Sequence, residues 1–179
     1  MMKLIVGIAV AMLAGIAGAS AQGYPNRPIT VVVPFAAGGV TDIVARIVTD
    51  RMKTALGQAV VVENQGGAGG TIATRQVAKS EPDGATLLIA TSSLAINPSL
   101  YPNVGYDPRK DFAPIALCVM SPYILSVNPA VPARTIQELI ALAKAKPGQL
   151  NYASAGNGTG PHLAGEMLKN MAKIDIVHG

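Results

Sequence analysis

The sequence predicts an α/β fold with mainly parallel β-sheets. Two features support this fold class. The first is a set of apolar runs that are rich in β-branched residues and do not alternate with polar ones. The second is that such runs are followed by a loop of small residues and then by a helical pattern. Uninterrupted apolar runs are typical of strands that are buried on both faces of a parallel sheet. Strand, loop and helix repeated in this order indicate parallel crossover units.

The first unit is predicted at residues 29–56. A buried strand is expected over 29–35, ITVVVPF, and a helix over 42–56, where apolar residues recur at helical spacing. Arg46 and Asp50 lie four residues apart in this helix, so we expect an ion pair between their side chains.

The same pattern continues along the chain. We expect a strand over 59–64, a glycine-rich loop over 66–70, a helix over 71–79 and a strand over 84–93. Residues 96–114 are rich in Pro, Asn, Gly and Asp, which predicts a long surface connection.

The segments IALCVM and YILSVNP come next and are predicted to be extended. Ser121 and Pro122 separate them, and a chain often passes from one domain to another in such a place. We therefore expect a first α/β domain over 22–122 and a second over 123–179. Cys118 is the single cysteine and lies in an apolar run, which predicts a buried thiol and no intrachain disulfide.

The second domain is predicted to begin with a capped helix. Thr135 and Glu138 have the spacing of a capping box, in which each side chain accepts a hydrogen bond from a backbone N–H at the helix start. A strand over 150–154, a helix over 162–172 and the start of a further strand at the chain end are expected to follow.

Residues 1–21 have the pattern of a secretory signal peptide. Lys3 provides a positive start, residues 4–18 are apolar, and residues 19–21 are small, as a signal peptidase requires. We expect the mature chain to begin at Gln22 and to be exported. The formal net charge is +4 and the basic residues are scattered, so neither a nucleic-acid surface nor a polybasic membrane patch is expected.

Small-residue loops before helices suggest an anion site. Neither loop 38–42 nor loop 66–70 has the lysine of a phosphate-binding P-loop, and the dinucleotide pattern is also absent. Loops 38–42 and 154–159 instead offer backbone N–H groups and hydroxyls at helix N-termini, without lysine or arginine. Such loops suit a carboxylate that must be released easily, and we expect them to face one another across a cleft between the domains.

Several of these residues have simpler structural interpretations. Gly38, Gly39 and Thr41 are also compatible with an ordinary strand-to-helix turn. Asp42 is expected to cap the helix or compensate its dipole rather than contact an acid. His162 could line the cleft or occupy a first helical turn at the surface.

Catalysis and metal binding are not expected. Ser154 lies in no G-x-S-x-G elbow and has no base near it in the sequence. No acid or second histidine accompanies His162 at the spacing of a metal site. We therefore predict no catalytic residue, no metal and no cofactor.

Five ordered motifs carry a resemblance to a known family. They are YPNRPITVVVPFAAGGVTDIVAR, VVVENQGGAGG, PDGATLLIATSSLAINPSLY, YDPRKDFAPIA and ELIALAKAKPGQLNYASAGNGTGPHLAGE. Through them, residues 24–178 resemble the extracytoplasmic solute receptors of tripartite tricarboxylate transporters, also called Bug receptors. The resemblance implies a periplasmic receptor of the type II binding-protein fold. Its two α/β domains would close over a small carboxylate (a di- or tricarboxylate, or an amino or aromatic acid) and deliver it to the membrane components of a transporter.

The resemblance also implies which residues bind the ligand. They lie in the loop at 35–42, after the strand at 84–93, in the loop at 154–159 and at the histidine that follows it. The expected set is Phe35, Ala36, Gly38, Gly39, Thr41, Asp42, Thr91, Ser92, Ser154, Ala155, Gly156, Asn157, Thr159 and His162.

The same resemblance predicts that the chain is incomplete. Family members continue beyond the strand that corresponds to IDIVH, through a V-P-Y-K-G-like segment, the rest of the second domain and a return into the first. This chain ends at Gly179, so we expect an incomplete second domain, an exposed sheet edge and bare apolar faces. Two alternatives to a working receptor stay open: a truncated remnant that binds nothing, and an α/β enzyme that acts on an acidic substrate.

Overall fold

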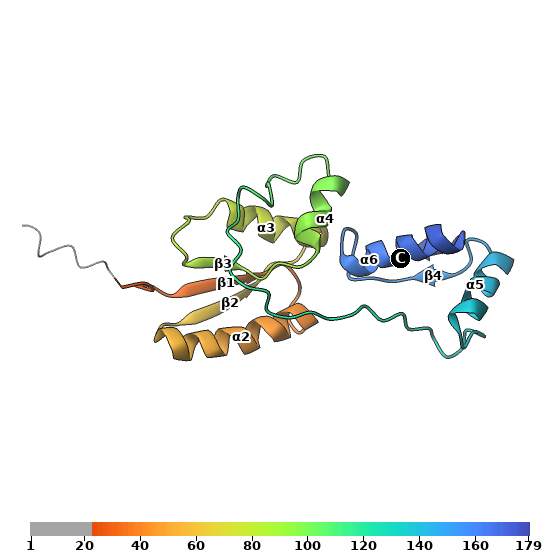
Figure 1. Ribbon diagram of the computed structural model, residues 1–179, viewed down its shortest axis with the longest axis horizontal. Coiled ribbons are helices and arrows are strands. Elements are labelled where there is room, and N and C mark those ends of the chain that lie inside the picture. Colours follow the sequence, from red (N-terminus) through yellow and green to blue (C-terminus); the bar gives the residue numbers. More distant parts are fainter. Residues whose placement is uncertain (1–22) are drawn as a thin grey trace, which may run out of the picture.

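The computed structural model describes residues 23–179 (Figure 1). The predicted signal peptide and Gln22 lie outside the described residues. The elements are, in chain order, β1 (Ile29–Val33), α2 (Val40–Leu56), β2 (Val60–Asn64), the 3-10 helix η1 (Ala68–Gly70), α3 (Thr71–Ala78), β3 (Thr86–Leu88), α4 (Ser93–Leu100), α5 (Ile136–Ala145), β4 (Asn151–Tyr152), α6 (Gly160–Ala172) and β5 (Val177–His178).

Strand β1 is the centre of a parallel three-stranded sheet with the order β2-β1-β3. Ile29 pairs with Val60 on one side of β1, and Thr30 pairs with Thr86 on the other. The apolar side chains of β1 are almost completely buried. The prediction of a parallel strand that is buried on both faces is therefore confirmed.

Helices α2 and α3 lie on opposite faces of this sheet (Figure 1). Successive side chains of a strand point to opposite faces. Val31 accordingly belongs to a core cluster that Met52 of α2 packs against, whereas Val32 packs with Ala73 and Val77 of α3. Burial of a valine side chain of this kind contributes about 1.5–3 kcal/mol, so the two clusters hold both layers on the sheet.

Helix α4 differs from the prediction. The sequence predicts a strand over 84–93 followed by an irregular connection, whereas β3 ends at Leu88 and α4 runs through Pro98. Pro98 has no N–H to offer the carbonyl of Leu94. That carbonyl instead accepts a hydrogen bond from the Tyr106 hydroxyl at 3.3 Å.

Asn97 supplies a second tertiary contact to α4. Its side-chain amide donates to the carbonyl of Gly69 and to the hydroxyl of Thr71, both at 3.0 Å, and the residue is only 1% exposed. A helix that contains proline, asparagine and serine has low intrinsic propensity. These contacts from η1 and α3 stabilise it, and single-sequence patterns do not show them.

The second part of the chain follows the prediction more closely. Thr135 and Glu138 form the expected capping box at the start of α5, with the Glu138 N–H donating to Thr135 Oγ1 at 3.2 Å. Strand β5 pairs in parallel with β4, with Tyr152 opposite His178. The predicted final strand is thus confirmed, and α6 begins two residues before the predicted start.

A long exposed connection joins the two parts. Residues 113–130 are all exposed and contain no helix or strand. Cys118 is exposed with them, so the prediction of a buried thiol is wrong. The apolar run around it looks like core in the sequence, but none of the described elements packs over it.

The predicted Arg46–Asp50 ion pair is also wrong. The Arg46 Nε donates to Asp42 Oδ2 at 3.0 Å, and Asp50 pairs with Lys53 at 3.1 Å. An acid on the N-terminal side of its basic partner is the more favourable order in a helix. Asp42 and Arg46 have that order, whereas Arg46 and Asp50 have the reverse.

We predict that the tyrosine hydroxyl over α4 contributes to stability. Replacing Tyr106 by Phe leaves the Leu94 carbonyl without its partner and should lower the free energy of unfolding by about 1 kcal/mol in urea titrations. Tyr24→Phe is the matched control, because the exposed Tyr24 hydroxyl also donates to a carbonyl, that of Gly84. Equal effects of the two substitutions would contradict the assignment.

Candidate ligand-binding site

The sheet topology places several loops at one edge. Because β1, β2 and β3 are parallel, the loops after them, at 34–39, 65–70 and 89–92, all leave the sheet at its carboxyl end. The chain passes from β1 to β2 on one side of it and then to β3 on the other side. In open α/β sheets this change of direction opens a crevice outside the carboxyl ends of the strands, where ligands bind.

A cavity of about 350 Å³ lies at this edge. It is bounded by loops from both parts of the chain, and two aromatic residues contribute to its lining. Its lining residues are Pro34, Phe35, Gly67, Ala68, Gly69, Gly70, Tyr101, Ala155, Gly156 and Asn157. The Tyr101 hydroxyl donates to the carbonyl of Asn157 at 3.5 Å, which links the two walls.

Three glycines allow the two walls to approach closely. A Cβ on Gly69 would overlap the carbonyl oxygen of Asn157, and one on Gly158 would overlap the side-chain oxygen of Asn97. A Cβ on Gly160 would overlap the hydroxyl of Tyr123, which also lies 3.2 Å from Ser92 Oγ. At these three glycines the backbone therefore lies directly against a carbonyl or side-chain oxygen.

The loop over η1 has an unusual backbone. Ala68 has a φ of 47°, a left-handed conformation that residues with a Cβ seldom adopt, and Gly67, Gly69 and Gly70 also have positive φ. Strained backbone of this kind concentrates at functional sites. The sequence predicts a glycine-rich loop at 66–70 and does not include it in the expected ligand-binding set, whereas residues 67–70 line the cavity.

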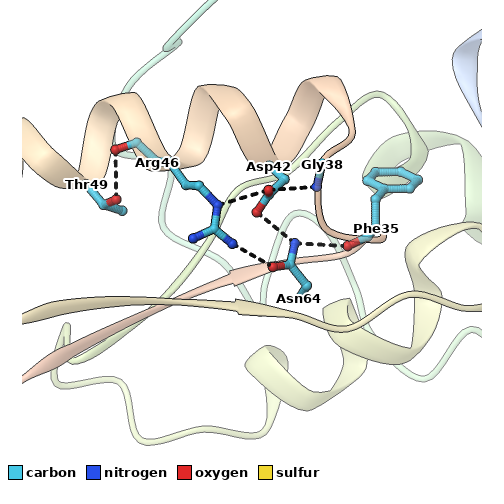
Figure 2. A network of polar contacts seen from close by, with 6 residues as sticks. All are labelled: Phe35, Gly38, Asp42, Arg46, Thr49 and Asn64. Atoms are coloured by element: carbon cyan, nitrogen blue, oxygen red, sulfur yellow. Dashed lines mark hydrogen bonds and ion pairs between the residues drawn. The ribbon is translucent and has the colours of Figure 1, made fainter.

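A buried carboxylate holds the first loop in shape (Figure 2). Asp42 is 3% exposed, and its Oδ2 accepts hydrogen bonds from the Gly38 N–H at 2.9 Å and from Arg46 at 3.0 Å. Its Oδ1 accepts from the Asn64 amide at 2.9 Å, and the same amide donates to the carbonyl of Phe35 at 3.2 Å. The network thus ties the first turn of α2 to the loop and to the end of β2.

Asp42 stays ionised over a wide pH range because of these donors. The Arg46 hydrogen bond, followed by those from Gly38 and Asn64, lowers the pKa of Asp42 from 3.8 to about 2. Both of its oxygens have protein partners, and it does not line the cavity. Its role in this structure is to position the loop.

Four helices begin in loops after the carboxyl ends of strands, and their N-cap residues make no side-chain capping hydrogen bond. They are α2, α3, α4 and α6, whose N-cap residues are Gly39, Gly70, Ser92 and Thr159. The first N–H groups of a helix have no partner inside the helix, and the helix dipole makes that end favourable for an anion. Helix α5 begins away from the cavity, and its N-terminus has the complete capping box.

The hydroxyls of the second loop are used within the loop. Thr159 Oγ1 donates to the Gly156 carbonyl at 2.6 Å, and Ser154 Oγ accepts from the Gly156 N–H at 3.1 Å. Ser154 Oγ also lies 2.8 Å from His178 Nε2. His162 does not line the cavity, and its Nδ1 accepts a hydrogen bond from the Gly158 N–H at 3.4 Å.

The expected ligand-binding residues therefore fall into two groups. Phe35, Ala155, Gly156 and Asn157 line the cavity. The others lie in the same loops or helix starts without lining it: Ala36, Gly38, Gly39, Thr41, Asp42, Thr91, Ser92, Ser154, Thr159 and His162. Sequence reasoning missed Tyr101, residues 67–70 and the second-loop partner His178. The rule that loops of parallel strands share one edge could have pointed to 67–70.

A second hollow, of about 270 Å³, lies at the opposite end of β1. Tyr24, Arg27 and Asp83 contribute to its lining, and Arg27 pairs with Asp83 at 2.5 Å. The charged groups of this hollow already satisfy one another. It also lies at the amino end of the strand, away from the edge where parallel sheets bind ligands.

Comparison with known proteins identifies the family. The model of the tripartite tricarboxylate transporter family receptor matches residues 44–179. The chain belongs to this family. The resemblance predicted from the five sequence motifs is thereby confirmed.

Individual family members agree with the assignment. Protein BugT of Bordetella pertussis is 40% identical over 177 residues, which cover 97% of this chain and 54% of BugT. The periplasmic binding protein BugD is 41% identical with a TM-score of 0.75, over 87% of this chain and 52% of BugD.

Two further solved structures contain a small acid. The R. palustris protein Rpa4515 with adipate is 36% identical (TM-score 0.84), and MatC from Rhodopseudomonas palustris with bound malate is 38% identical (TM-score 0.79). The match covers 88% and 87% of this chain and 53% of each of those chains. The predicted binding-protein fold is confirmed, and the chain spans about half the length of the relatives it matches.

A membrane-spanning helix and a metal-binding cluster are both absent from the part of the chain that the structure describes. Across residues 23–179, no helix is long and apolar enough to cross a membrane. The same residues contain no group of three or more histidine, cysteine, aspartate or glutamate side chains that could hold a metal ion.

We predict that Asp42 makes the fold sensitive to acid. Its pKa is lower in the folded protein than its ordinary 3.8, so its contribution is complete above about pH 4 and is lost as the pH falls through about 2. Asp42→Asn should therefore lower the urea midpoint at pH 7, and the difference from the unsubstituted protein should shrink towards pH 2. Asp50→Asn is the control on the same helix, because Asp50 is in an exposed pair with Lys53. A pH-independent difference for Asp42→Asn would contradict the prediction.

Proposed function

We propose that the chain belongs to a periplasmic receptor that captures a small carboxylate between two α/β domains for the membrane components of a tripartite tricarboxylate transporter. The observation that carries the proposal is the cavity at the carboxyl edge of the parallel sheet, which is walled by loops 67–70 and 155–157. Four helices begin in the loops after the strands without a side-chain cap. The periplasmic location rests on the signal-peptide pattern of residues 1–21 and on the family.

The charge of the lining supports a reversible anion site. Among the described residues, no lysine, arginine, aspartate or glutamate lines the cavity. Arg46 is close to the first loop, but it is engaged by Asp42 and Asn64. An anion would therefore bind to backbone N–H groups and helix dipoles, which are weaker than a fixed guanidinium and permit release.

The ligands of relatives favour a dicarboxylate. Adipate and malate both carry two carboxylates and occur in structures that share this fold. Loops from both parts of the chain wall the cavity here, so each could take one end of such an acid. The hinge of this receptor would lie at 121–129, next to the expected domain boundary near residue 122, and these residues belong to the exposed connection at 113–130.

An enzyme is the second candidate, because Ser154 Oγ lies 2.8 Å from His178 Nε2. Such a pair resembles the start of a nucleophile–base arrangement. The Ser154 hydroxyl, however, also bonds to Gly156 within its loop, and no carboxylate among residues 23–179 hydrogen-bonds His178. We therefore favour binding without turnover.

We predict that one class of acid stabilises the purified protein. Heat-unfolding scans with panels of mono-, di- and tricarboxylates should show a raised Tm with dicarboxylates, since ligand at 100 times its Kd adds about 2.7 kcal/mol. Chromatography should recover the acid unchanged after incubation. No shift with any acid would contradict the receptor, and consumption of the acid would favour the enzyme.

We predict that closure requires a glycine at position 158. Gly158→Ala places a methyl group against the Asn97 side chain. Because an overpacked contact destabilises the arrangement in which the two parts meet, the affinity for the stabilising acid should fall about 10-fold or more. Gly57→Ala is the control: its φ of 62° causes similar backbone strain, but nothing lies within 4 Å of the new methyl group. Equal loss of affinity in the two variants would contradict closure at Gly158.

A further inference from the structure

Two imidazole rings support the second ligand loop from different elements. His162 lies in the first turn of α6 and His178 in β5, and their ring centroids are 4.6 Å apart. His162 Nδ1 accepts from the Gly158 N–H at 3.4 Å, and His178 Nε2 lies 2.8 Å from Ser154 Oγ. Both contacts are to residues of loop 154–159, three residues of which line the cavity.

The contact of His162 resembles one at the start of α5. There, Glu138 at the third helical position accepts hydrogen bonds from the N–H groups of Arg134 at 2.6 Å and Thr135 at 3.2 Å. His162 occupies the third position of α6 and accepts from Gly158, the residue before the N-cap. An imidazole nitrogen accepts a hydrogen bond only when it carries no proton. The contact therefore requires the neutral tautomer of His162 with its proton on Nε2.

His178 does not have this restriction. When neutral, its Nε2 can accept from the Ser154 hydroxyl. When protonated, it donates to Ser154 Oγ, and the Ser154 hydroxyl hydrogen turns to the Gly156 carbonyl at 3.3 Å. Protonation of His178 keeps its bond to the loop, whereas protonation of His162 removes one.

The charged and titratable groups around the two rings are Tyr152, Glu166 and Lys169. Tyr152 lies 4.8 Å from the His178 ring by centroids, and its hydroxyl donates to Glu166 Oε1 at 2.7 Å. Burial, followed by the bond to Glu166, raises the pKa of Tyr152 to about 12, and the same bond with that of Lys169 lowers the pKa of Glu166. The pKa of Tyr152 is raised and that of Glu166 is lowered, both away from the range between pH 5 and 8 in which the charge of a histidine side chain ordinarily changes.

We propose that His162 is a positioning residue that holds loop 154–159 in its ligand-competent shape only while its imidazole is neutral, so that acidification weakens carboxylate binding. This regulation rests on the proposed receptor function. An imidazolium in the first turn of α6 also opposes the positive end of the helix dipole. The charge of Glu166, which interacts with that of His162, offsets part of this repulsion, so the loss of the Gly158 contact is the change that loosens the loop.

The first test needs no ligand. In NMR spectra of the whole protein recorded from pH 8 to pH 5, the Gly158 amide should shift along the titration of His162, whose ring nitrogens should report the Nε2–H tautomer at pH 8. His162→Gln keeps an uncharged acceptor at the same position and should remove the pH dependence. His178→Gln should leave it in place. A Gly158 amide that does not follow His162, or an Nδ1–H tautomer, would overturn the proposal even if the variants failed to fold.

The second test measures binding of malate and adipate by calorimetry at pH 7.5 and 5.5. Between pH 7.5 and pH 5.5, the affinity of the unsubstituted protein should fall about threefold to tenfold more than that of His162→Gln. This difference corresponds to the contribution of one hydrogen bond. Protonation of the acids themselves affects both proteins equally and cancels in this comparison. Equal pH dependence of the two proteins would overturn the proposal. Absence of binding at every pH would instead contradict the receptor function, and the NMR titration would still decide the role of His162.

Discussion

Strand β1 runs between β2 and β3 and is covered by α2 on one face and by α3 on the other. The position of the site follows from this burial. Parallel neighbours send their loops to one edge, and neighbours on opposite sides of β1 leave a crevice between those loops. The alternation of Val31 and Val32 between two apolar clusters keeps the strand in this position.

The polar groups near the cavity mostly satisfy one another. Asp42 uses the guanidinium of Arg46 and the amide of Asn64, and the hydroxyls of Ser154 and Thr159 bond within their own loop. The groups that remain available to a ligand are backbone N–H groups, including those at helix N-termini. Such groups would suit an anion without a fixed cation, as the proposed receptor function requires.

The two parts of the chain meet through small contacts. Gly69, Gly158 and Gly160 permit the approach, and the exposed connection at 113–130 joins the parts. Several side chains of this connection are large and apolar, among them Ile115, Met120 and Ile124, each at least 80% exposed.

The sequence by itself determined the fold class, the buried strand β1, the capping box at Thr135 and the two loops that adjoin the cavity, because periodicity and turn residues are local properties. Tertiary structure decided the rest. Helix α4 depends on the hydroxyl of Tyr106 and on the bonds of Asn97, the Asn64 amide joins Asp42 to the first loop, and Cys118 is exposed. The approach of residues 67–70 to 155–157 across the cavity and the contact of His178 with Ser154 join residues far apart in the chain. Local patterns could not show them, since the energies that select them come from groups that only folding brings together.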